Sequence, residues 1–167
     1  MKTNTQPALV QVNDLRHLNR LQSHVATWAA LHTRDAFFQT FFRNWADTNE
    51  DWSQQLAAFS KTGREPAELN ALKGEWQGLL NLAAVRSKGM RTADFFAMTD
   101  KLFALEEMLL KRLLKLLQLN ANLKPVAETR LKEITLLREA MTYLEQYDAV
   151  FEGAKVAVMA AEIERRA

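Results

Sequence analysis

The feature that most constrains this chain is the scarcity of residues that interrupt helices. The sequence holds 5 Gly and 3 Pro among 167 residues, fewer than the roughly 7% Gly and 5% Pro of average proteins. Apolar residues recur at intervals of three and four along most of the chain, which is the spacing of one helix face, and no segment reads as a pair of strands. The sequence therefore predicts an all-α protein.

The few breakers and the residues that favour helix ends divide the chain into five expected helices. After an irregular start at residues 1–8, we expect them at about residues 9–32, 33–60, 66–87, 93–120 and 125–165. Thr33 is the predicted N-cap of the second helix and Gly63 its C-terminal cap, while Pro66 and Pro125 suit a first helical turn. The run DTNED at 47–51 is a point where the second helix is expected to break or kink.

The length and the short connections suggest how these helices are arranged. A chain of 167 residues favours one domain, and connections of about four to six residues favour antiparallel neighbours. We therefore expect a single helical domain, an up-and-down bundle of four to five helices. Its last two helices would form a long C-terminal helical hairpin of roughly 40 Å that serves as the spine.

The stretch LLKRLLKLLQL at 109–119 resembles a membrane-active peptide when it is quoted alone. In a helix over 95–123, however, its apolar residues cover about half of the circumference, which calls for two or more neighbouring helices. Asp100, Glu106 and Glu107 share the polar face with the lysines, whereas a helix on a membrane surface has a polar face dominated by cations. The pattern predicts a core helix, with an oligomer seam and a lipid-facing role as alternatives.

Composition excludes several functional classes. Lys and Arg number 22 against 20 Asp and Glu, which is far from the charge of a protein that binds nucleic acid mainly by its overall field. The absence of Cys excludes disulfides, zinc ribbons and thiol catalysis. The N-terminus lacks the apolar segment of a signal peptide, and no run is long enough and uncharged enough to span a membrane. Cytoplasmic localisation is therefore expected.

No pattern of residues specifies a reaction. Glycine-rich phosphate loops, Ser-His-Asp arrangements and the Glu-x-x-His pairs of di-metal bundles are not found. His17 and His24 lie seven residues apart, so they are near each other on a helix, but they lack matching carboxylates. We expect no enzyme activity, no cofactor and no metal.

An aromatic cluster offers a candidate partner-binding surface. Its members lie close together in the second predicted helix, where they cover more than one side, so they cannot all point to the centre of a small bundle. Core packing is the commoner role of such a cluster, but aromatic residues also supply many interface hot spots. The predicted partner-binding residues are Phe37, Phe41, Phe42 and Trp45.

Cations gather in one predicted connection and at the C-terminus. If the two groups meet in the fold, they would form a small patch for phosphate or nucleic acid, because cationic side chains neutralise phosphate charge. The residues of this second candidate site are Arg86, Lys88, Arg91, Arg165 and Arg166.

Two short stretches are similar to a known family. DAFFQT at 35–40 and QLAAF at 55–59 resemble the N-terminal helical region of the PriC family, bacterial primosome proteins that act in replication restart. The similarity covers about fifty of the 167 residues and rests mostly on Ala, Leu and Phe. It would imply a strongly basic, Arg-rich second half that binds DNA, whereas the second half of this chain, which contains LLKRLLKLLQLNANLKP, holds nearly as many acidic as basic residues. The resemblance is therefore a minor alternative, and no family is assigned.

The sequence favours a non-enzymatic helical module that binds a protein partner, as an adaptor, chaperone or assembly subunit, with homo-oligomerisation left open. A nucleic-acid-associated accessory factor, for example in DNA replication, is the first alternative. A coat protein of a lipid or polymer inclusion, using the helix at 93–120, is the second.

Overall fold

A computed structural model describes residues 5–59, 65–86, 89–116, 122–147 and 163–166. These residues contain no strand, which confirms the predicted all-α class, and a short helical turn lies at 163–166. The five long helices are α1 (Thr5–His32), α2 (Ala36–Ala57), α3 (Ala67–Val85), α4 (Thr92–Leu116) and α5 (Leu123–Tyr147).

The helix ends differ from the predicted ones by a few residues. α1 begins at Thr5 and so includes part of the segment expected to be irregular. α5 ends at Tyr147, and most of its expected extension to residue 165 lies outside the described residues, as does Gly63.

The start of α2 shows why one cap prediction was wrong. Asp35, not Thr33, is the N-cap, and its Oδ1 accepts hydrogen bonds from the backbone N–H groups of Phe37 (2.9 Å) and Phe38 (3.2 Å). The backbone N–H of Thr33 donates instead to the carbonyl oxygen of Ala29 at 3.1 Å, so Thr33 completes the end of α1. The predicted break at residues 47–51 is also wrong, because α2 runs through this segment without interruption.

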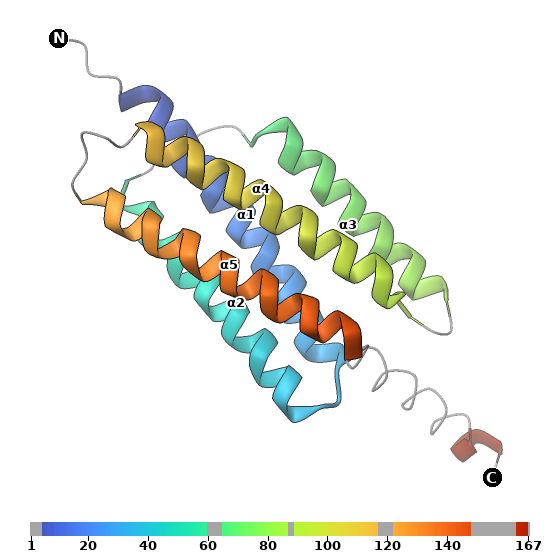
Figure 1. The fold of residues 1–167 in the computed structure, drawn as a ribbon. Coiled ribbons are helices and arrows are strands. Elements are labelled where there is room, and N and C mark those ends of the chain that lie inside the picture. Colours follow the sequence, from blue (N-terminus) through green and yellow to red (C-terminus); the bar gives the residue numbers. More distant parts are fainter. Residues whose placement is uncertain (1–4, 60–64, 87–88, 117–121, 148–162, 167) are drawn as a thin grey trace.

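α1 is the central helix of the described fold. Successive helices alternate in direction, and α1 crosses the middle of the arrangement, where it packs against α2 and α4, while α5 packs against α4 (Figure 1). The inner face of α1 is fully buried at Leu15, Leu18 and Val25. Helices α4 and α5 are neighbours, as expected. The central position that was predicted for their hairpin is occupied by α1.

The leucine-rich part of α4 lies in this core. Leu109, Leu110 and Leu113 are at most 4% exposed, whereas Lys111 is exposed and Leu116 is 40% exposed. Residues 117–119 lie outside the described part. Where it is described, the stretch packs within its own chain. Among the described helices, none combines the length and apolar character needed to cross a membrane.

α3 packs less extensively than the other helices. Its buried residues are Leu69 and Trp76, and it contacts α1 and α4 only sparsely. Gly74 and Gly78 lie on its exposed side, where a Cβ atom added to either would meet no atom within 4 Å. Nothing in the described chain therefore requires glycine at these two positions.

Replacing Gly78 by Ala should stabilise the protein. A glycine inside a helix costs about 0.5–1 kcal/mol relative to alanine, because more backbone freedom is lost on folding. We expect the free energy of unfolding, measured by urea denaturation, to rise by about that amount.

Gly89 provides the matched control for this variant. It also has open space around an added Cβ atom, but its φ is +70°, a conformation that favours glycine over residues with a side chain. Gly89→Ala should therefore destabilise the protein. If Gly78→Ala and Gly89→Ala changed the free energy of unfolding equally, the helical conformation of Gly78 and the positive φ of Gly89 would be contradicted.

Candidate functional site

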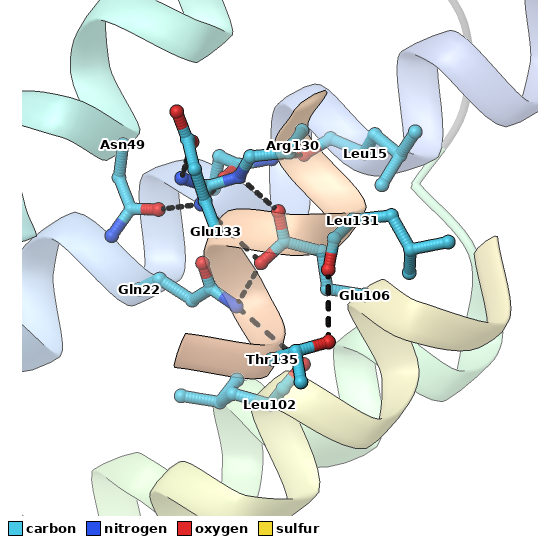
Figure 2. Close-up of polar contacts among 10 residues, drawn as sticks. Leu15, Gln22, Asn49, Leu102, Glu106, Arg130, Leu131, Glu133 and Thr135 are labelled. Carbon is cyan, nitrogen blue, oxygen red and sulfur yellow. Dashed lines mark hydrogen bonds and ion pairs between the residues drawn. The ribbon is translucent and has the colours of Figure 1, made fainter. Parts of the chain in front are cut away.

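The centre of the fold holds a buried ion pair that the sequence did not suggest. Arg130 of α5 is 1% exposed and Glu106 of α4 is 0% exposed. The Nε of Arg130 donates to Oε1 of Glu106 at 2.7 Å, and Nη2 lies 3.4 Å from Oε2 (Figure 2). The two charges therefore compensate each other inside the protein.

Three amide side chains complete the site. Nη2 of Arg130 donates to Oδ1 of Asn19 in α1 (3.0 Å) and to Oδ1 of Asn49 in α2 (2.5 Å). Nε2 of Gln22 in α1 donates to Oε2 of Glu106 at 2.7 Å. All three amide side chains are buried. We call Asn19, Gln22, Asn49, Glu106 and Arg130 the buried polar cluster.

The buried polar cluster joins four helices at one depth of the core. Desolvating two charges is costly, and a buried ion pair is tolerated only when geometry and further hydrogen bonds compensate that cost. Here both carboxylate oxygens of Glu106 and two nitrogens of the Arg130 guanidinium have close partners. A shift of any of these helices along its axis would separate these partners, so the cluster fixes the register of α1, α2, α4 and α5.

Helical spacing places these polar residues in the core. Glu106 has buried Leu102 and Leu110 four residues away on either side along α4, and residues four apart share a helix face. Arg130 lies between Ala127 and Ile134 on the buried side of α5 in the same way. The assignment of Glu106 to the polar face of its helix was therefore wrong, although this spacing could have revealed it.

An open cleft of about 420 Å³ lies beside the cluster, between α2 and α5. Arg130 forms part of its lining, and the Cζ of Arg130 lies 6.0 Å from the ring centroid of Trp52. Asp51 and Glu133 contribute carboxylates, and Nη1 of Arg130 lies 3.4 Å from Oε2 of Glu133. We call this the α2–α5 cleft. The remaining lining residues are Thr48, Gln55, Pro125, Val126 and Thr129.

The predicted aromatic surface is largely core. Phe42 is 0% exposed and Trp45 is 2% exposed. The ring of Phe42 meets that of Phe95 edge-on with centroids 5.9 Å apart, and the ring of Trp45 lies 5.2 Å from that of Phe103. Because α2 packs this side against α1 and α4, neither Phe42 nor Trp45 is accessible to a partner in this fold.

The other predicted aromatic residues lie nearer the surface. Phe37 is 71% exposed, and its ring contacts that of Phe38 at a centroid distance of 5.4 Å. Phe38 and Phe41 are partly buried against the core. Leu31, at the other side of the connection between α1 and α2, is 73% exposed and was not predicted as a site residue. We call Leu31 and Phe37 the corner surface.

The predicted cationic patch is partly neutralised. Nε of Arg91 donates to Oδ2 of Asp94 at 2.7 Å and Nη2 to Oδ1 at 2.9 Å, while Nη1 of Arg86 lies 3.8 Å from Oδ2. The hydrogen bonds from Arg91 lower the pKa of Asp94. Arg165 and Arg166 lie on the helical turn beyond α5, and Lys88 lies outside the described residues. Phosphate binding by this set stays a prediction.

The histidines are placed in different environments. Nδ1 of His17 lies 3.3 Å from Oε1 of Glu65, which also pairs with Lys73. Burial lowers the pKa of His17, and the hydrogen bond from Lys73 lowers that of Glu65. His24 is exposed. Over the part of the chain that the structure describes, no three His, Asp or Glu side chains gather as a metal site would require.

Comparison of the chain with protein-family models, with curated proteins and with solved structures gives no match.

Proposed function

We propose that the chain, folded as an up-and-down bundle, is a non-enzymatic helical module that binds a protein partner through the corner surface. The observation that carries the proposal is the exposure of two large apolar side chains on either side of a three-residue connection. Leu31 is 73% exposed at the end of α1, and Phe37 is 71% exposed in the first turn of α2.

The corner surface is well suited to bury apolar area at a modest entropic cost. Removing a Leu or Phe side chain from water contributes about 1.5–3 kcal/mol. The ring of Phe37 already rests on Phe38, and Asp35 caps the helix that carries it. Little conformational freedom therefore remains to be lost when a partner binds. Aromatic anchors of this kind are common among interface hot spots.

A photo-crosslinking amino acid at position 37 tests the proposal in cells. We expect it to capture a distinct protein, whereas the same amino acid in place of Leu136, which is 65% exposed on α5, should not. Crosslinking to a second copy of the same chain would identify an assembly subunit. Crosslinking to a different protein would identify an adaptor or chaperone. Equal capture at both positions would contradict a localised binding surface.

Substitution of the two corner residues should then abolish the captured interaction. The variant Leu31→Ser with Phe37→Ser removes both apolar side chains of the corner surface, so we expect the affinity to fall at least about tenfold, a change of about 1.4 kcal/mol. Leu136→Ser is the matched control and should bind normally. Surface substitutions usually change stability by no more than about 0.5 kcal/mol, so a folded variant that retains binding would exclude the corner surface.

A further inference from the structure

The middle of the outward side of α3 carries no charged residue, although 25% of the chain is charged. α3 lies at the edge of the described helices and packs against α1 and α4 with its other side (Figure 1). Exposed residues recur along the outward side at alternate steps of four and three, which is the spacing of a coiled-coil seam. We call this line of exposed residues the α3 seam: Ala67, Ala71, Gly74, Gly78, Asn81 and Val85.

Two apolar side chains and two glycines indicate that the α3 seam is a contact surface. Val85 is 87% exposed, and Leu82, beside the seam, is 48% exposed. Glycine inside a helix lowers its stability relative to alanine, and no atom of the described chain lies near a Cβ added at Gly74 or Gly78. A second helix that approaches α3 closely would account for both the exposed apolar surface and the glycines, because the distance between packed helices depends on the side chains at the contact.

The charged residues beside the seam show which kind of helix would fit. Glu75 is paired with Lys101 of α4. Glu68, in the first turn, has no salt bridge with a described residue, and Arg86, the C-cap residue, has one long contact of 3.8 Å between Nη1 and Oδ2 of Asp94. Glu68 and Arg86 lie on the same side of the seam, because the residues between them make about five full turns. One weakly compensated acid and one weakly compensated base therefore stand at opposite ends of α3.

An antiparallel second copy of α3 matches the seam position by position. When the midpoints of two such helices lie opposite each other, the six seam residues form three facing pairs, and each pair occurs twice. Two of the pairs join a larger side chain to a small one, and the third brings two glycines together at the crossing. A parallel pair would place valine on valine and glycine on glycine, so the helices could not keep an even distance. The antiparallel pairs are Val85 with Ala67, Asn81 with Ala71, and Gly78 with Gly74.

We propose that the α3 seam binds the α3 seam of a second copy of this chain in antiparallel orientation. In this orientation Glu68 of one copy lies at the same end as Arg86 of the other, about 3 Å apart along the helix axis, so opposite charges are matched at both ends. Glu75 stays paired with Lys101 of its own chain. The α3 seam and the corner surface have no residue in common, so this self-association does not depend on the function proposed above.

Sedimentation velocity of the full chain, at increasing concentrations up to about 1 mM, tests the proposal because a weak dimer forms in this range. We expect a reversible rise in mass from one chain to two. Gly78→Glu fills open space in the single chain but puts an uncompensated charge at the crossing, so it should weaken association at least about tenfold. Leu136→Glu adds the same charge at an exposed position of α5 and should associate normally. Circular dichroism checks that both variants are folded.

The orientation can be tested with cysteine, which the chain lacks. Under mild oxidation, the variant that combines Ala67→Cys with Val85→Cys should form a disulfide-linked dimer, because facing positions can reach the Cα separation of about 4.4–6.8 Å that a disulfide requires. The two positions are about 27 Å apart within one helix, so they cannot link to each other in the same chain. Val85→Cys alone should stay unlinked, because the two copies of residue 85 lie at opposite ends of an antiparallel pair.

Three results would overturn the proposal. A chain that stays monomeric up to about 1 mM would have no dimer of this kind. Self-association that Gly78→Glu leaves unchanged, but that Leu31→Ser with Phe37→Ser abolishes, would place the contact on the corner surface. Efficient disulfide formation by Val85→Cys alone would mean that the two helices are parallel.

Discussion

Replacing Arg130 by Met should lower the free energy of unfolding by about 3–5 kcal/mol, because it leaves the charge of Glu106 buried without its partner. Glu106 is 0% exposed and would retain only the hydrogen bond from Gln22. Asn19 and Asn49 would also lose the donor to their side-chain oxygens. Urea denaturation followed by circular dichroism measures the change directly.

The double variant separates the effect of the charge from that of side-chain volume. Glu106→Leu combined with Arg130→Met removes both charges while keeping the core filled, so it should cost less than the sum of the two single variants. Replacing a whole buried ion pair by apolar residues is often close to neutral. Here some loss should remain, because each buried amide without a partner costs about 1–3 kcal/mol. Strictly additive effects would mean that Glu106 and Arg130 are not coupled.

Phe42→Ala should destabilise the protein by about 3–5 kcal/mol, the usual cost of a cavity left by a buried phenylalanine. Phe42 is fully buried, and its ring contacts those of Phe41, Trp45 and Phe95. The remaining structure can fill only part of the space that the ring leaves. Thermal and chemical denaturation provide independent measurements of the loss.

Phe37→Ala is the natural comparison, because it makes the same change five residues away at a position that is 71% exposed. We expect it to change the free energy of unfolding by no more than about 0.5 kcal/mol. Two variants with equal stability would contradict the division of the aromatic cluster into a core part and a surface part.

The helices could be predicted because their pattern is local. Apolar residues at intervals of three and four indicate where each helix lies, and all five long helices overlap the predicted ranges. The helix ends were less predictable, because alternative N-caps differ by small free energies. The backbone N–H of Thr33 belongs to the end of α1, and Asp35 is the N-cap of α2. The polar run at 47–51 does not interrupt α2, because its side chains fit the two sides of the helix. Asn49 is on the buried side, where its Oδ1 accepts a hydrogen bond from Arg130, and Asp47 and Asp51 are on the exposed side.

The candidate sites could be predicted only in part, because they depend on pairings between distant segments. Periodicity places Asn49, Glu106 and Arg130 on buried faces, but it does not reveal that they meet. Asn19 and Arg130 are 111 residues apart in the sequence. Similarly, the aromatic pattern located the cluster near Phe37, but only the packing of α2 against its neighbours shows which rings are covered.

The sparse packing of α3 has a consequence for how stability is distributed over the molecule. The buried polar cluster requires α1, α2, α4 and α5 to be docked together, and α3 contributes no residue to it. Local opening follows the least packed elements of a protein, so α3 is the helix that can detach at the lowest cost while the other four stay closed. Amide hydrogen exchange in α3 would then proceed through openings much less costly than global unfolding, and the chain would behave as a cooperative unit of four helices with a fifth that exchanges on its own.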